Sequence, residues 1–296
     1  MRERVEIFEM APRDGLQNEA RTIPLAQKIA LVDCLSRAGF SRIEVASFVS
    51  SKWVPQMADS AQVLGGITRK RGLSYTALTP NLRGFEAAVG AGADEVAVFA
   101  SASEGFSRAN INCSISESLE RFIPVLNAAN VRKMKVRGYV SCVTDCPFEG
   151  EISPEAVAHV AGALLDMGCY EISLGDTIGQ GIPDRVRAML EAVLEAVPVA
   201  QVAGHFHDTA GRALANIEVA LDMGVRVFDA AVGGLGGCPY APGAKGNVAT
   251  ERVLARLLEL GFDPGLDAQI VAQAAKMAQA MRTNVPPKGQ RGKDAG

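Results

Sequence analysis

The 296-residue sequence predicts an α/β fold, a (β/α)8 TIM barrel with a short helical extension after it. Eight β-rich runs alternate with longer helix-compatible stretches, and the length matches the ~250 residues that such a barrel needs. An open doubly wound sheet is the alternative, but it would usually have fewer strands and a phosphate loop after the first one. We expect a catalytic barrel over residues 1–265 and a C-terminal helix and polar tail over 266–296.

The predicted strands are short runs rich in apolar and β-branched residues: Val5–Met10, Arg42–Ser47, Leu73–Leu78, Glu95–Ser101, Lys135–Cys142, Tyr170–Gly175, Val202–Asp208 and Val227–Gly233. The clearest helices between them are Ile23–Ala38, Ser114–Ala129, Ser153–Met167 and Pro183–Ala196. Ser153 before Pro154 is a typical helix start, because serine caps free amides and proline needs no donor there. Glycine tolerates the left-handed backbone that ends a helix, which we expect at Gly39, Gly90, Gly168, Gly224 and Gly261.

The composition argues against several classes of protein. Hydrophobic residues make up 48% of the chain, which is enough for a large core, and the net charge of −3 comes without the basic block of a nucleic-acid-binding protein. No apolar run reaches the ~18–20 residues of a membrane span. Six cysteines do not make a disulfide framework, and the first strand begins at Val5, so we expect a cytoplasmic protein with reduced thiols and no leader peptide.

Reactive residues gather at the predicted carboxyl ends of the strands, where the active sites of such barrels lie. Along the chain they are Arg13 and Asp14 after the first strand, Glu44 in the second, Asp176 after the sixth, His205 and His207 on the seventh, and Cys238 and Asn247 in the glycine-rich segment after the eighth. This distribution predicts one site assembled from most of the barrel.

His205 and His207 give the strongest signal. Residues two apart on a strand point to the same side, so both imidazoles can enter the mouth of the barrel. Such a pair can bind a metal ion, and the alternative is a pair of hydrogen-bonded core histidines. Asp14 and Asn247 would add oxygen ligands, and a mixed nitrogen and oxygen set favours Mg²⁺ or Mn²⁺ over a structural zinc ion.

Three further residues have both a chemical and a structural interpretation. The Arg13 guanidinium suits an oxygen that gains negative charge during a reaction, or it forms only a salt bridge. Glu44 stands in an apolar run, so its buried carboxylate needs a partner, and we favour an arginine over an acid/base role. For Cys238 the loop alone favours an inert thiol, and a proton donor on a mobile lid is the alternative.

Several segments carry longer motifs. They are APRDGLQNE at 11–19, SFVSSKWVPQM at 47–57, NINCS at 110–114, SLGDTIG at 173–179, HFHD at 205–208 and the glycine-rich segment 233–247. Together these motifs resemble the hydroxymethylglutaryl-CoA lyase family, from Val5 to about Leu260. Shorter pieces, Arg-Asp-Gly and His-x-His, are shared with isopropylmalate and homocitrate synthases.

The resemblance implies a metal-dependent carbon–carbon lyase that cleaves 3-hydroxy-3-methylglutaryl-CoA to acetyl-CoA and acetoacetate, in leucine degradation and ketone-body formation. It implies a divalent metal, Mg²⁺ or Mn²⁺, on Asp14, His205, His207 and Asn247, catalytic roles for Arg13 and Cys238, and supporting roles for Glu44 and Asp176. Asn18, Ser50 and Lys52 lie in mouth loops and are candidate substrate contacts. We expect an acyl-CoA substrate, no nucleic-acid or membrane partner, and a homodimer or higher homo-oligomer.

Other activities stay open at this point. A lyase for a longer substrate, such as 3-hydroxy-3-isohexenylglutaryl-CoA, would keep the same metal site. A Claisen-type condensing synthase would need a regulatory domain that ~30 residues after the barrel cannot supply. A binding scaffold without activity would make the metal ligands a coincidence. Either Asp14 or His207 is the candidate general base.

Overall fold

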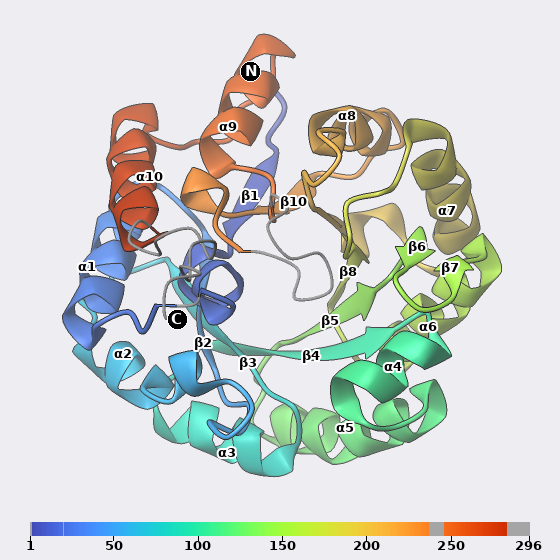
Figure 1. Cartoon of the computed structure of the whole chain (residues 1–296), viewed down its shortest axis with the longest axis horizontal. Coiled ribbons are helices and arrows are strands. Elements are labelled where there is room, and N and C mark those ends of the chain that lie inside the picture. The colour runs from blue at the N-terminus through green and yellow to red at the C-terminus, as the bar shows by residue number, and fades with distance from the viewer. Residues whose placement is uncertain (1, 20, 237–245, 283–296) are drawn as a thin grey trace, which may run out of the picture.

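Eight parallel strands close into a barrel in the computed structural model, which describes residues 2–19, 21–236 and 246–282 (Figure 1). The barrel strands are β1 (Glu6–Glu9), β2 (Arg42–Ser47), β3 (Ser74–Leu78), β4 (Glu95–Ser101), β5 (Val136–Ser141), β8 (Glu171–Asp176), β9 (Val202–Phe206) and β10 (Val227–Ala230). Their closed order is β1-β10-β9-β8-β5-β4-β3-β2. The predicted (β/α)8 barrel is therefore confirmed.

A layer of helices surrounds the barrel (Figure 1). They are α1 (Leu25–Ser36), α2 (Ser60–Gly66), α3 (Leu82–Gly90), α4 (Glu104–Ile111), α5 (Ile115–Val131), α6 (Pro154–Asp166), α7 (Pro183–Ala196), α8 (Ala213–Asp222), α9 (Thr250–Glu259) and α10 (Ala268–Arg282). Short helical turns are η1 (Ala11–Gly15), η2 (Pro55–Met57), η3 (Val199–Gln201) and η4 (Val232–Gly234). The last helix, α10, packs against α1 and η4. Within the described ranges, every helix is too short or too polar to cross a bilayer.

Local sequence explains most element ends. The Ser153 side chain accepts a hydrogen bond from the Ala156 amide, as expected for a capping serine before Pro154. Some predicted ends were wrong. Helix α1 begins at Leu25, not Ile23, because Pro24 has an extended backbone. Gly90 is still helical, and the left-handed glycine after α3 is Gly92.

A small hairpin between β5 and α6 was not predicted. It pairs β6 (Asp145–Cys146) with β7 (Gly150–Glu151), and Gly150 supplies a left-handed backbone at its turn. Each strand is only two residues long, which is too short for a pattern of alternating polarity to show. The hairpin lies on the carboxyl side of β5, the same side as the candidate residues.

The interior of the barrel contains ion pairs where such barrels usually contain branched apolar side chains. Arg137 on β5 bonds Asp229 on β10, and these strands are not neighbours in the barrel, so the two side chains cross its interior. Arg42 on β2 likewise reaches Glu171 on β8. Each buried charge therefore has an opposite charge beside it, as burial requires.

A cavity of about 650 Å³ opens at the amino ends of the strands. Arg42, Glu95, Lys135 and Tyr170, which begin or precede their strands, contribute to its lining. None of the candidate residues lines this cavity, and the chemistry is expected at the opposite end. We therefore do not assign the site to this cavity.

Glu9 at the end of β1 holds three active-site segments together. Its Oε1 accepts hydrogen bonds from the backbone amides of Ala11 in η1 (2.9 Å) and Val232 in η4 (3.0 Å). Its Oε2 accepts one from the hydroxyl of Thr250, the first residue of α9 (2.7 Å). Burial raises the pKa of Glu9 to about 7, although these three hydrogen bonds act in the opposite direction.

We predict a pH-dependent difference in stability between the native chain and Glu9→Gln. Because the folded pKa lies above the unfolded value, the contribution of Glu9 is fully present below pH 4.5 and is lost as the pH rises through about 7. The free energy of unfolding of the native chain should fall relative to the variant by roughly 2–3 kcal/mol over that interval. Urea unfolding at pH 4.5, 6 and 8 measures it. Glu191→Gln, on the exposed face of α7, is the control, and a constant difference for Glu9→Gln would contradict the assignment.

Candidate active site

The Arg-Asp-Gly sequence after β1 forms a single turn of π-helix, η1, a form of helix that is frequent at functional sites. The amides of Arg13 and Gly15 donate to the Met10 carbonyl oxygen at 3.2 and 3.1 Å, which closes the turn. A Cβ on Gly15 would lie 2.8 Å from the Cβ of Leu235. A larger residue would therefore push η1 away from Leu235 in the glycine-rich segment 233–247.

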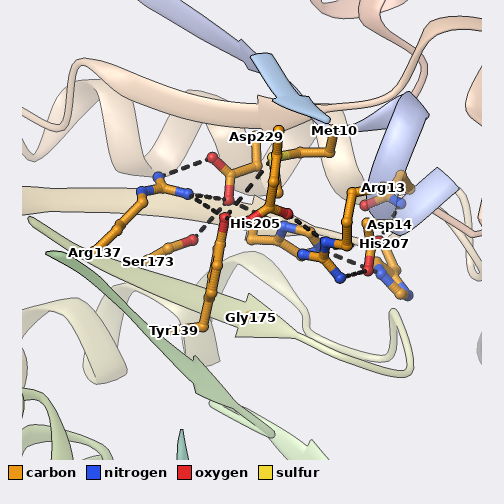
Figure 2. A network of polar contacts seen from close by, with 12 residues as sticks. Met10, Arg13, Asp14, Arg137, Tyr139, Ser173, Gly175, His205, His207 and Asp229 are labelled. Carbon is orange, nitrogen blue, oxygen red and sulfur yellow. Dashed lines mark hydrogen bonds and ion pairs between the residues drawn. The ribbon is translucent and has the colours of Figure 1, made fainter. Parts of the chain in front are cut away.

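Asp14, His205 and His207 form a cluster at the carboxyl ends of β1 and β9 (Figure 2). Each offers one ligand atom, and these atoms lie within 4.8 Å of one another. The two Nε2 atoms are 3.3 Å apart, and His205 Nε2 is 3.9 Å from the Asp14 carboxylate. The fold thus brings together two histidines on one strand and an aspartate that precedes them by about 190 residues in the sequence.

Asn247 reaches the same cluster through an isolated β-bridge to His207. Its Nδ2 donates to Asp14 Oδ2 (2.6 Å) and to the Leu235 carbonyl oxygen (3.2 Å). Its Oδ1 is buried and has no hydrogen-bond partner among the described residues. A buried acceptor without a partner, beside a carboxylate and two imidazoles, fits the mixed ligand set of a divalent cation.

The charges around the cluster keep Asp14 and His207 in the forms that bind cations, whereas Asp229 and Asp14 raise the pKa of His205 against the effect of its burial. Burial acts to raise the pKa of Asp14, but the charge of Arg13, followed by the neighbouring histidines and the hydrogen bond from Asn247, outweighs it and holds that pKa at about 2. Burial, together with the neighbouring His205, lowers the pKa of His207 to about 4. Near neutral pH, Asp14 is therefore an anion and His207 is neutral, as metal binding requires.

Arg13 lies beside the cluster and is almost fully buried. Its Nη1 is 2.7 Å from Asp14 Oδ1, and its Nε forms a short ion pair with Glu44. The Tyr139 hydroxyl donates to the other Glu44 oxygen (3.1 Å). Burial raises the pKa of Glu44 against the opposing effect of Arg13. Glu44 thus has the arginine partner that we expected for it. It binds the Nε side of the guanidinium, and Nη1 contacts Asp14.

Asp176 has a different environment. Its carboxylate is buried and accepts hydrogen bonds from the Thr144 hydroxyl (3.1 Å) and from the amides of Gln180 (3.2 Å) and Gly181 (3.0 Å). Burial raises its pKa to about 6. In the described parts of the chain, the hydrogen bonds of the Asp176 carboxylate come from Thr144 and from the segment after β8. These contacts fix the backbone of that segment.

The remaining predicted residues lie in loops at the mouth. Asn18, Ser50 and Lys52 are exposed, and Ser50 Oγ accepts a hydrogen bond from the Lys52 amide (3.4 Å). The Lys52 ammonium lies 5.9 Å from the ring centre of Trp53. Cys238 lies outside the described residues.

Sequence analysis missed the polar residues directly behind the cluster. Asp229 on β10 accepts a hydrogen bond at 3.1 Å from His205 Nδ1, and Arg137 and Ser173 also donate to its carboxylate (Figure 2). The signal was present, because Arg137 and Asp229 are charged residues inside apolar strands, like Glu44. The argument that a buried charge needs a partner would have found both.

Comparison with known proteins agrees with this geometry. The sequence profile of the HMGL-like family matches residues 4–278. The chain belongs to the HMGL-like family. That match spans all eight barrel strands and most of α10, so the family extends over both the Asp14, His205 and His207 cluster and the residues that contact it.

Individual members of the family are also similar over most of their length. Hydroxymethylglutaryl-CoA lyase of Pseudomonas mevalonii is 58% identical over 91% of this chain and 89% of its own length. A Pseudomonas aeruginosa protein named 3-hydroxy-3-isohexenylglutaryl-CoA/hydroxymethylglutaryl-CoA lyase is 57% identical over 92% of this chain and 91% of its own. The crystal structure of the HMG-CoA lyase from Brucella melitensis has a TM-score of 0.94 and 59% identity, and the match covers 95% of this chain and all of that one.

Proposed function

We propose that this chain is a divalent-metal-dependent carbon–carbon lyase that cleaves 3-hydroxy-3-methylglutaryl-CoA to acetyl-CoA and acetoacetate. The observation that carries the proposal is the position of the buried Arg13 guanidinium, 2.7 Å from Asp14 in the cluster of Asp14, His205 and His207. Relatives that are 57–58% identical over about nine-tenths of the chain are named for this reaction. The cleavage would provide acetoacetate at the end of leucine degradation.

Asp14, His205, His207 and Asn247 are the residues that would hold the cation. A divalent ion bound there supplies Lewis acidity, which makes the 3-hydroxyl group of the substrate more acidic. Mg²⁺ or Mn²⁺ suits the two oxygen and two nitrogen donors. The buried Oδ1 of Asn247, which has no partner in the described structure, supports this assignment.

Cleavage begins with removal of the proton from the 3-hydroxyl group. The base would be either the Asp14 carboxylate or the His207 imidazole, which is neutral because burial and His205 lower its pKa to about 4. The O–H electron pair then forms the ketone of acetoacetate. The electron pair of the C2–C3 bond moves onto the acetyl thioester as an enolate.

Arg13 has the role of binding that enolate. Its positive charge is held in place before the reaction by the ion pairs to Asp14 and Glu44, so no reorganisation is required when charge develops on the thioester oxygen. A proton delivered to C2 completes acetyl-CoA. We assign this proton to the thiol of Cys238 in the glycine-rich segment.

Removal of the metal should abolish cleavage. We expect a chelator to eliminate acetoacetate release and added Mg²⁺ or Mn²⁺ to restore it. His207→Ala should weaken Mn²⁺ binding by more than the ~10–100-fold typical of a change outside the ligand shell. Calorimetric titration of Mn²⁺ measures this, with His159→Ala on the exposed face of α6 as the control. Full activity in chelator would refute metal dependence.

Substitution of Arg13 separates catalysis from metal binding. Arg13→Gln should lower kcat by about 10²–10³-fold, because a preorganised charge of this kind stabilises the transition state by ~3–4 kcal/mol. The dissociation constant for Mn²⁺ should stay close to that of the native chain. Arg108→Gln on α4, an exposed arginine, should change neither quantity. Near-normal turnover by Arg13→Gln would contradict the role.

A longer 3-alkyl substituent is the second candidate, because one similar protein is named for the isohexenyl substrate as well. Initial rates with methyl- and isohexenyl-glutaryl-CoA at matched concentrations distinguish the two. We expect a higher kcat/KM for the methyl compound. The opposite ranking would transfer the assignment to the isohexenyl substrate, and no acetoacetate or longer keto acid from either would refute a lyase.

A further inference from the structure

We propose that Asp229 is the positioning residue of this site, and that it holds the His205 imidazole in the tautomer that presents Nε2 to the metal. The inference rests on the proposed function, because it concerns the same metal cluster. Asp229 lies on β10, next to His205 in the register with β9. It is 1% exposed, and it stands at the only position of β10 that carries a charge.

Three hydrogen bonds from two residues fix the Asp229 carboxylate. Arg137 donates to both of its oxygens, from Nη1 at 2.9 Å and from Nη2 at 2.8 Å. The Ser173 hydroxyl donates to Oδ2 at 2.7 Å. A bidentate guanidinium sets the plane of a carboxylate as well as its position. Oδ2 is thereby aimed at His205 with little freedom to rotate.

The fixed oxygen determines where the proton of His205 lies. Nδ1 is 3.1 Å from Asp229 Oδ2, and an ionised carboxylate only accepts hydrogen bonds, so Nδ1 of the neutral imidazole carries the proton. Nε2 then keeps its lone pair, and it faces His207 and Asp14 (Figure 2). Groups that orient a metal-binding imidazole in this way typically change metal affinity by ~10–100-fold when they are removed.

The same residues connect the metal cluster to Arg13. Arg137 Nη1 also donates to the Tyr139 hydroxyl (3.1 Å), and Tyr139 donates to Glu44, the partner of Arg13. The contacts close a ring through the interior of the barrel: Arg13, Glu44, Tyr139, Arg137, Asp229, His205 and Asp14. Within this ring, Asp229 is the residue that contacts Nδ1 of His205, the ring nitrogen that does not face Asp14 and His207.

The first test uses the native chain without metal. The sequence contains only three histidines, so the side-chain ¹⁵N spectrum of ¹⁵N-histidine-labelled protein will hold three ring systems. His205→Gln assigns its own signals by their loss. We expect the neutral His205 ring to be in the Nδ1–H tautomer, and the spectrum is recorded at alkaline pH because Asp229 and Asp14 raise the pKa of this imidazole. An Nε2–H tautomer would overturn the proposal, and this result does not depend on whether any variant folds.

The second test removes the carboxylate. Asp229→Ala should raise the dissociation constant for Mn²⁺ by ~10–100-fold and release His205 from the Nδ1–H tautomer. Glu171→Ala is the matched control, because it removes another buried carboxylate from Arg137, which donates to Glu171 Oε1 at 2.6 Å, without touching His205. Circular dichroism confirms that both variants are folded. An Mn²⁺ affinity of Asp229→Ala equal to that of the native chain, or equally weakened in Glu171→Ala, would overturn the proposal.

These readouts separate the two proposals. Neither the tautomer nor the Mn²⁺ affinity involves an acyl-CoA, so both can be measured on a chain that cleaves nothing. If the native chain binds Mn²⁺ but does not release acetoacetate, the proposed function fails and the role of Asp229 stands. If it cleaves the substrate while Asp229→Ala binds Mn²⁺ normally, only the role of Asp229 fails.

Discussion

The structure depends on the neutralisation of charge buried inside the barrel. Arg137 places a guanidinium where an unpaired cation would be strongly destabilising, and Asp229 and Glu171 surround it. This pairing has a consequence at the mouth, because the anion that neutralises Arg137 is also the one beside His205. The same carboxylate, Asp229, therefore both neutralises a buried cation and contacts an imidazole of the site. A barrel filled with branched apolar side chains would be as well packed, but it would leave the imidazole free to turn.

Much of the fold could be predicted because the strands of a parallel barrel are covered on both faces and appear as nearly continuous apolar runs. Strands β2 and β4 have the predicted bounds, Arg42–Ser47 and Glu95–Ser101. The residues at which strands end were less predictable where contacts with distant parts of the chain determine them. The last barrel strand ends at Ala230, three residues before the predicted Gly233, because Val232 turns toward Glu9 and both following glycines have left-handed backbones.

The site was predictable only where its pattern is local. The spacing of His205 and His207 on one strand is visible in the sequence, and so is the isolated charge of Glu44. The partnership of Arg137 and Asp229 is not, because 92 residues separate two charges that meet only when the barrel closes. The place of Asp176 at a strand end is visible in the sequence as well, but its hydrogen bonds to Thr144 and to the amides of Gln180 and Gly181 depend on the folded loops.

The contact between Asp14 and Asn247 has a consequence for how the molecule is made. These residues are 233 positions apart, and their side chains meet at 2.6 Å across the seam where the first and last barrel strands pair. Contacts of such high contact order form late, after the entropy of closing a long loop has been overcome. A nascent chain still short of Asn247 therefore lacks this contact, and a cation held by the four proposed ligands would stabilise only the finished protein. If the proposed cation binds, its binding would therefore report completed folding.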